Sequence, residues 1–342
     1  MESDGDSGIV IGEEVGGGLV AVPRQDRVVV EDGVNLAVRA WDPPAGRSRG
    51  VPFVLLHGIA SSSVAWDGVA RKLAGAGRAA YARDLRGHGL SETSDDGDPG
   101  AGRFDLATLA ADLVAVLGAL RLNRPILVGH SLGANVILEA VAAGAVAAQF
   151  AGLPMASSPI AGGVGLVEGG LVDAGAQFAT LEECLARMAL PPVAGMPLPH
   201  LQAYLRRSNP TWSGGQFAAA MAAFNVHADG TVSWRLTAAR QESLLRALWA
   251  ARVADRWPAV HVPALCVVAD TGDADWTAAR KAAVPVMERA IPGVRIEWLT
   301  AEHDVHTSRP DEVADLLLEA FPPDQSTGTG RPVSIFRPVR RR

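Results

Sequence analysis

The sequence predicts an α/β protein in which strands and helices alternate around one sheet. Short runs rich in β-branched residues recur along the chain, among them "VPFVLLHG" and "RPILVG". Longer stretches rich in alanine and leucine lie between them, such as "TLAADLVAVLGAL", and this alternation is typical of an α/β sheet. Of the 342 residues, 48% are hydrophobic, which is ample for a buried core.

The predicted strands fall into two groups, which a long interruption separates. The first group comprises residues 27–30, 35–41, 51–58, 79–85, 124–129 and 162–170. The "EDG" between the first two runs is a hairpin signal. After the interruption come 262–270 and 294–300, and the last of these leads into "RPDEVADLLLEAF", a helix with a proline near its start. We therefore expect eight strands.

The interruption is predicted to be a mostly helical cap. Leu181, Leu185 and Met188 follow the spacing of a helix. The prolines of "LPPVAGMPLPH" separate two helices, because a helix interior does not accommodate proline. An insertion between two core strands would cover the edge of the sheet. The expected organisation is a core at 26–169 and 257–322, a cap at 170–256, and disordered ends at 1–25 and 323–342.

Composition narrows the classes of partner. The net charge of -6 gives no basic field that would attract nucleic acid or an anionic membrane, so a small-molecule substrate is the expected partner. Cys184 and Cys266 are the two cysteines, too few for a disulfide framework or a spaced set of metal ligands. No apolar run reaches the ~18 residues of a membrane span. The first residues do not have the form of a signal peptide, so we expect a cytoplasmic protein.

The stretch "ILVGHSLGAN" places Ser131 between an apolar run and an alanine-rich run. A serine hydroxyl is a weak nucleophile at neutral pH, so a catalytic serine needs exposure, a neighbouring base and donors for the oxyanion. The G-x-S-x-G pattern at a sharp strand-to-helix turn supplies the exposure, and Gly129, Gly133 and Ala134 leave room beside the serine. The helix that follows directs its N–H groups toward the site. Ser131 is therefore the expected nucleophile.

A base and an acid are then expected downstream, in the order serine, acid, histidine. Of the eight histidines, His303 and His306 follow the last core strand. His303 lies nearer to the strand end and is the expected base, whereas His306 is expected to be an exposed loop residue. The acid is left open among Asp270, Asp273 and Asp275 in "VVADTGDADW".

The oxyanion hole requires two backbone N–H donors. The residue after the nucleophile, Leu132, supplies one, and Ile59 in the "HGIASSS" loop is expected to supply the other. His57 precedes this loop and is predicted to be a hydrogen-bonded structural histidine rather than a base.

Taken in order, "LLHGIASSS", "DLRGHGLS", "GHSLG" and "EHDVHTSRPDEVADLLLEAF" make the chain resemble the α/β-hydrolase superfamily, as a serine-nucleophile, esterase- or lactonase-like member, over about residues 26–322. The resemblance implies an α/β-hydrolase fold: an eight-stranded, mostly parallel sheet with helices on both faces and a helical cap inserted after strand 6. It also implies Ser131 as nucleophile, His303 as base, an aspartate after the seventh strand, and neither cofactor nor metal.

The resemblance also bears on neighbouring positions. We expect Asp273 to be the acid because it lies at the tip of the loop after the seventh strand, where a turn can present it to His303. The alternative is Glu168 at the end of the sixth strand, where the similar haloalkane dehalogenases place a glutamate as the third member of the triad. Serine at 131 argues against dehalogenases and epoxide hydrolases, which have aspartate there. The family segment that shapes the loop beside the site is matched by Asp84, Arg86 and His88.

The expected function is that of a serine hydrolase that cleaves an ester, lactone or thioester through an acyl-enzyme. Two alternatives stay open: hydrolysis of a carbon–carbon bond by the same triad, and a non-catalytic protein that binds ligands. The cap offers large apolar side chains to an apolar part of the substrate, although such a stripe also suits the core of the cap: Phe178, Met188, Trp212, Phe217, Met221, Phe224 and Trp234.

Overall fold

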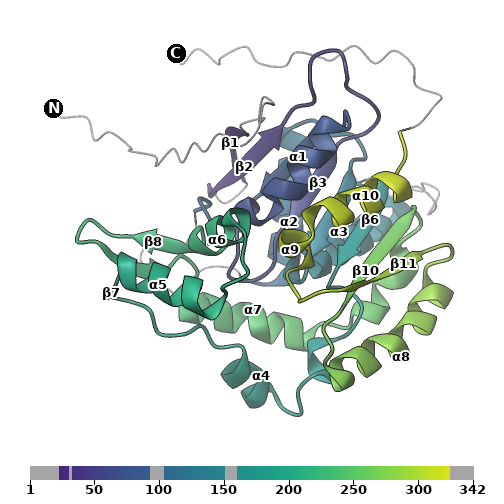
Figure 1. The fold of residues 1–342 in the computed structure, drawn as a ribbon. Helices are drawn as coiled ribbons and strands as arrows, with labels where there is room; N and C mark the ends of the chain where they lie inside the picture. The colour runs from purple at the N-terminus through teal and green to yellow at the C-terminus, as the bar shows by residue number, and fades with distance from the viewer. Residues whose placement is uncertain (1–22, 31–32, 93–103, 151–159, 324–342) are drawn as a thin grey trace.

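The computed structural model describes residues 23–30, 33–92, 104–150 and 160–323. Its main feature is an eight-stranded sheet with the strand order β1-β2-β4-β3-β5-β6-β10-β11 (Figure 1). The strands are β1 (Arg24–Val29), β2 (Asn35–Trp41), β3 (Phe53–Leu56), β4 (Ala80–Arg83), β5 (Ile126–His130), β6 (Gly163–Val167), β10 (Ala264–Asp270) and β11 (Arg295–Thr300). All eight predicted strands are confirmed.

The sheet is parallel except at one edge. β2 pairs antiparallel with both β1 and β4, whereas the pairs from β4 through β3, β5, β6 and β10 to β11 are parallel. Parallel strands end at the same edge of a sheet, so the loops that follow β3, β5, β6, β10 and β11 meet there. Every predicted site residue lies in or next to one of these loops.

Helices cover both faces of the sheet. On one face lie α1 (Asp67–Gly75), α9 (Val305–Ser308) and α10 (Pro310–Ala320), and on the other lie α2 (Leu106–Ala119), α3 (Leu132–Phe150) and α8 (Ala274–Ala290). Alternate residues of β3 point to opposite faces, so Phe53 and Leu55 pack into one apolar cluster and Val54 and Leu56 into the other. The core thus consists of two apolar layers on either side of the sheet.

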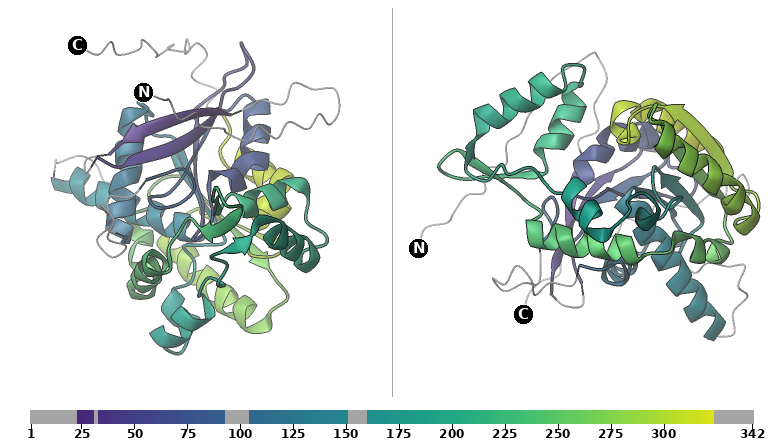
Figure 2. Two further views of the ribbon diagram at one scale, coloured as in Figure 1. Left: turned by 90° about the vertical axis from the view of Figure 1, so that its left-hand side faces the viewer. Right: turned by 90° about the horizontal axis from the view of Figure 1, so that it is seen from below.

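The segment between β6 and β10 forms the cap. It contains four α-helices, α4 (Leu181–Arg187), α5 (Leu198–Ser208), α6 (Gly214–Met221) and α7 (Ala238–Ala250). It also contains a small antiparallel sheet of β7 (Met196–Pro197), β9 (Thr231–Trp234) and β8 (Phe224–Val226), which the sequence analysis missed. These strands are too short for an alternating pattern to be visible. The cap elements gather on one side of the molecule, and β1 and β2 lie on the other (Figures 1 and 2).

Two of the sequence-based boundaries concern the ends of the chain. The predicted disordered segments 1–25 and 323–342 lie almost entirely outside the described residues, as does most of the "EDG" turn. Arg24 and Gln25, however, belong to β1, which begins two residues before the predicted core boundary. Within the described ranges, no helix has both the length and the apolar character that crossing a membrane requires.

Candidate active site

Ser131 occupies a strained turn between β5 and α3. Its φ is +51°, in the left-handed region that side chains other than glycine rarely adopt. A Cβ atom at Gly129 would collide with the backbone of Gly133 and Ala134, and one at Gly133 would collide with the carbonyl oxygen of Leu56. The glycines of the G-x-S-x-G pattern are therefore required by the close approach of the backbone, and this turn presents Ser131 at the sheet edge.

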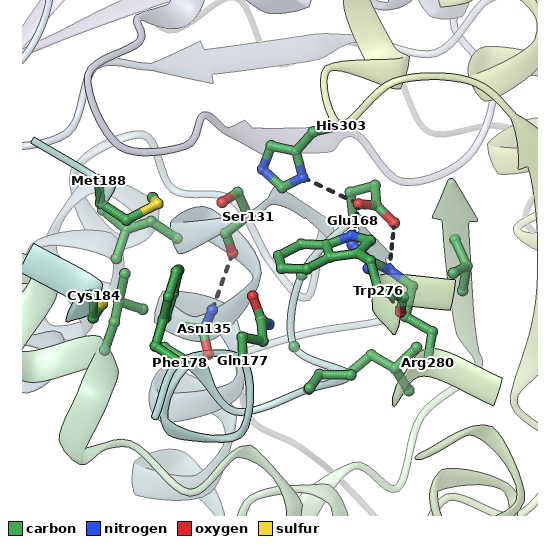
Figure 3. A pocket seen from close by; sticks show the side chains of 18 of the residues that line it. Ser131, Asn135, Glu168, Gln177, Phe178, Cys184, Met188, Trp276, Arg280 and His303 are labelled. Carbon is green, nitrogen blue, oxygen red and sulfur yellow. Dashed lines mark hydrogen bonds and ion pairs between the residues drawn. The ribbon is translucent and has the colours of Figure 1, made fainter. Parts of the chain in front are cut away.

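The turn is also tied to the end of β6. The Ser131 N–H donates to the carbonyl oxygen of Val167 at 3.1 Å. Gly169 packs so closely that a Cβ there would collide with the Ser131 backbone. From the other side, the Asn135 amide donates to the Ser131 carbonyl oxygen at 3.1 Å (Figure 3). The position of Ser131 is thus fixed by the sheet and by the first turn of α3.

Glu168 is the carboxylate that contacts His303, the predicted base. Nδ1 of His303, in the loop after β11, lies 3.1 Å from Oε2 of Glu168. Glu168 directly follows β6 with a φ of +48°, and its side chain is 1% exposed, whereas that of His303 is 44% exposed. Figure 3 shows the His303 ring between Ser131 and Glu168. Among the described residues, no hydrogen bond joins the Ser131 hydroxyl to His303, although both residues line the same pocket.

The choice of Asp273 as the acid is corrected by its position. Asp273 is exposed and caps the N-terminus of α8, where its Oδ1 accepts the N–H of Trp276 at 2.9 Å. Asp270 accepts the Thr277 hydroxyl at 3.2 Å, and Asp275 lies in the first turn of α8. The alternative weighed from the sequence, Glu168, is the one in contact with His303.

The Glu168 carboxylate is held in its ionised form. Oε1 accepts the Ala269 N–H at 2.7 Å and Nε of Arg280 at 3.1 Å. Oε2 accepts Nη2 of Arg280 at 2.6 Å in addition to His303. Burial alone would raise the pKa of the Glu168 carboxyl, but the hydrogen bonds from His303, Arg280 and Ala269, together with the Arg280 charge, bring the pKa below its ordinary value.

The two predicted oxyanion donors flank the nucleophile. Leu132 opens α3, and Ile59 follows Gly58, at which a Cβ would lie 3.1 Å from the Cβ of Ser131. Within the described part of the chain, neither the Ile59 N–H nor the Leu132 N–H has a hydrogen-bond acceptor. Both donors are therefore available to a ligand at Ser131.

His57 has the structural role expected of it. It is completely buried, its Nδ1 bonds the Gly58 carbonyl oxygen at 2.7 Å, and its Nε2 accepts the Leu85 N–H at 2.9 Å. Burial lowers the pKa of His57 to about 3, so the ring is neutral at physiological pH. Asp84, in the matched family segment, accepts the N–H groups of Ser63 at 2.6 Å and Leu90 at 2.8 Å and so shapes the adjacent loop.

The other segment residues are also buried. Arg86 forms two hydrogen bonds with Asp112, at 3.0 and 2.7 Å, and Nδ1 of His88 bonds the Arg86 carbonyl oxygen at 2.9 Å. These contacts support the structural role that the resemblance implies for the segment.

His306 differs from the expectation of an exposed loop residue. It lies on α9, is 1% exposed, and stacks between Trp66 and His130 at ring-centroid distances of 4.5 and 4.1 Å. His130, which precedes the nucleophile, donates from Nε2 to the His303 carbonyl oxygen at 3.0 Å. The stacked rings thus connect the His303 loop to β5. Sequence gives no sign of this because the three rings come from distant segments.

One group of possible metal ligands occurs in the described ranges. Donor atoms of His130, Asp304 and His306 lie within 4.8 Å of one another. Nε2 of His130 is already bonded to the His303 carbonyl oxygen, and the Asp304 side chain is 68% exposed. These residues pack the His303 loop, and their arrangement is not that of a closed metal site.

Ser131, Glu168 and His303 open onto a cavity of about 350 Å³ between core and cap. Its wall is mainly apolar and includes Leu171, Val172, Phe178, Cys184, Met188, Leu245, Leu248, Cys266 and Trp276. Both cysteines are free, as expected. Asn135, Gln177 and Arg280 add polar groups at the wall (Figure 3).

The apolar side chains predicted for the cap divide between two roles. Phe178 and Met188 line the cavity. Met221, Phe224 and Trp234 instead belong to the cap's own core. Phe217 packs under the Arg206 guanidinium, and Trp212 lines a separate polar hollow beside Glu302 and Arg309.

Comparison with known proteins agrees with this fold. A family model described as "Alpha/beta hydrolase family" matches residues 53–316, and the chain belongs to this family. It is 34% identical over 115 residues to a non-heme chloroperoxidase of Streptomyces lividans (34% of this chain, 38% of the relative). It is 36% identical over 114 residues to an N-formylmaleamate deformylase of Pseudomonas putida (33% and 40%). The matched stretches thus span about two fifths of these relatives.

The fold is also similar to that of solved structures. The crystal structure of E-2-(acetamidomethylene)succinate hydrolase superimposes with a TM-score of 0.65 at 20% identity, covering 87% of this chain and 98% of that one. At this identity the likeness concerns the fold.

Proposed function

We propose that this protein is a serine hydrolase that cleaves a carboxylic ester, lactone or thioester of a small, partly apolar substrate. The observation that carries the proposal is the placement of Ser131, on its strained turn, beside His303, whose Nδ1 is bound by the buried carboxylate of Glu168. A serine, a histidine next to it in space and an ionised acid on the far side of the histidine are the groups needed for acyl transfer through a covalent intermediate.

The geometry supports a two-stage reaction. In the first stage, Nε2 of His303 takes the hydroxyl proton of Ser131 while Oγ attacks the substrate carbonyl carbon. The N–H groups of Ile59 and Leu132 stabilise the resulting oxyanion. The alcohol or thiol departs with the proton from His303 and leaves the acyl group on Ser131. Glu168 stays ionised, fixes the tautomer of His303 and stabilises the imidazolium.

In the second stage, His303 takes a proton from water, and the hydroxide attacks the acyl carbon. Collapse of the second tetrahedral intermediate breaks the bond to Ser131 Oγ, which regains its proton from His303, and releases the carboxylic acid. No redox partner enters this balance. The mainly apolar cavity favours substrates whose acyl or alcohol part is hydrophobic.

The test compares Ser131→Ala with Ser243→Ala, which removes an exposed hydroxyl from α7. Turnover of p-nitrophenyl esters of increasing acyl length, and of one N-formyl amide suggested by the name of the deformylase relative, is measured together with labelling by a fluorophosphonate. We expect Ser131→Ala to lower turnover by roughly 10³-fold or more and to abolish labelling, with a folded protein, because the small side chain suits the turn. Ser243→Ala retains both.

Two results would count against the proposal. A folded wild type that neither hydrolyses these substrates nor takes up the probe indicates a ligand-binding protein. Probe labelling without turnover of the esters or of the amide directs the search to carbon–carbon bond hydrolysis by the same serine.

A further inference from the structure

Arg280 forms a buried ion pair with the acid of the site. Its Nε and Nη2 reach the two oxygens of Glu168 at 3.1 and 2.6 Å, and the side chains are 7% and 1% exposed. Such a bidentate pair fixes the plane of the carboxylate. Because Oε2 accepts both Arg280 and His303, the orientation that Arg280 imposes is also the one that His303 encounters (Figure 3).

Arg280 is itself held by the start of α8. Its guanidinium lies 4.1 Å from the ring centroid of Trp276, and Nη1 donates to the Trp276 carbonyl oxygen at 3.3 Å. Asp273 caps the same turn through the Trp276 N–H. Asp273, which the sequence led us to expect as the acid, therefore supports the helix turn from which Arg280 reaches Glu168.

The pair changes the electrostatics that His303 experiences. A lone buried carboxylate strongly favours a protonated histidine beside it, because the two charges attract in a medium of low dielectric constant. When the carboxylate is paired with a guanidinium, the two groups together have no net charge. Its attraction for the imidazolium is therefore smaller.

We propose that Arg280 is a positioning residue that orients Glu168 and offsets its charge, so that His303 remains available as a base at lower pH than an unpaired carboxylate would allow. This inference rests on the proposed function of Ser131, Glu168 and His303. It assigns to Arg280 no contact with the reacting atoms.

The other titratable groups around the pair are neutral or exposed. From β5, His130 lies 4.7 Å from the His303 ring, and its burial and the His303 charge lower the pKa of His130 to about 4. On α9, burial keeps the pKa of His306 well below its usual range. From β10, burial raises the pKa of the Cys266 thiol to about 12. Asp304 is exposed to solvent, which screens its charge.

The experiment replaces Arg280 in one variant by a neutral residue and in a second variant by another cation. In Arg280→Met, we expect the acidic limb of the kcat/KM profile for one activated ester to move up by about one pH unit, because the unpaired Glu168 holds the proton on His303 more strongly. In Arg280→Lys the charge remains, so the limb stays at its wild-type position although kcat is lower. Arg289→Met, which removes an exposed arginine from the same helix, leaves the whole profile unchanged.

A second readout does not depend on turnover. The titration of the His303 ring, followed by NMR, is expected to move in the same direction by about one pH unit in Arg280→Met. If Arg280→Met does not fold, Arg280→Gln provides the same loss of charge. A neutral variant that is less stable but keeps both the limb and the ring titration in place overturns the inference. A wild type without turnover or probe labelling overturns the proposed function instead, and the ring titration still reports on Arg280.

Discussion

At the scale of single residues, the site contains two carboxylates at adjacent strand ends with different tasks. Glu168 binds His303, and Asp273 accepts a backbone N–H at the start of α8. We expect Glu168→Gln to reduce turnover of an activated ester at pH 7 by about 10³-fold or more, because an amide cannot stabilise the imidazolium and misdirects the His303 tautomer. Asp273→Asn should retain turnover within about threefold, since asparagine caps a helix as well as aspartate does. The reverse order of the two variants would return the role of acid to Asp273.

The sequence places both Asp273 and Glu168 near the end of a strand, where an acid of the site is expected, and does not decide between them. The placement of Ser131, His303, Ile59 and Leu132 at one edge of the sheet could be predicted because it depends on chain order and on strand ends. Asp273 follows a strand, as an acid of the site would, but it also directly precedes α8, where an aspartate can cap the helix. In the structure it caps the helix. Glu168 directly follows a buried strand and precedes Gly169, which the close approach of Ser131 requires to be glycine, but that contact is visible only in three dimensions.

At the scale of elements, the cap contributes one wall of the cavity. Phe178 precedes α4 and Met188 follows it, and both line the cavity, whereas Trp212 between α5 and α6 lines a different hollow. Phe178→Ala and Met188→Ala are each expected to shift the preference among p-nitrophenyl esters toward longer acyl chains, with a change of about tenfold in the ratio of kcat/KM for octanoate over butyrate. Trp212→Ala is the matched control and should leave this ratio unchanged. An unaltered ratio in both cavity variants would place the acyl group elsewhere.

The elements of the core could be predicted more completely than those of the cap. Among the core strands, β3, β5 and β6 are buried along their whole length and β10 along all but its last residue, and these mainly apolar runs stand out between helices. The β7, β8 and β9 strands contain two, three and four residues. β8 and β9 form a short local hairpin, whereas β7 pairs with β9 across more than thirty residues of chain. A local pattern therefore predicted the cap helices and missed the small sheet.

At the scale of the whole molecule, buried histidines make stability depend on pH. Burial lowers the pKa of His57 and His88 to about 3, that of His130 to about 4 and that of His306 well below its ordinary value. The unfolded chain takes up protons at these rings below about pH 6.5, whereas the folded protein does not, so stability falls with pH from there downward. Each ring contributes at most about 1.4 kcal/mol per pH unit. The folded-state pKa of the Glu168 carboxyl lies below its ordinary value of 4.5, so its contribution to stability is present above that value and is lost as the pH falls from it to the lower folded pKa, which is below most of this range.

We therefore expect the melting temperature to decrease steadily between about pH 6.5 and pH 4.5, measured by thermal unfolding in buffers of constant ionic strength. His306→Phe should make the dependence of the melting temperature on pH less steep, because one histidine fewer takes up a proton in the unfolded chain. The variant is expected to fold, since phenylalanine can stack between Trp66 and His130. His200→Gln changes an exposed histidine and should leave the slope as it is. A melting temperature that is constant over this range would mean that the buried rings accept protons in the folded state.

The bond between the Ser131 N–H and the Val167 carbonyl oxygen has a mechanical consequence. Ser131 and Glu168, the proposed nucleophile and acid, directly follow two neighbouring strands of one sheet, whereas His303, the proposed base, lies on a loop that follows β11. The proposed proton transfer from Ser131 to His303 therefore depends on the position of this one loop, whereas the β5–β6 pairing does not, so the proposed activity can be lost without loss of the sheet.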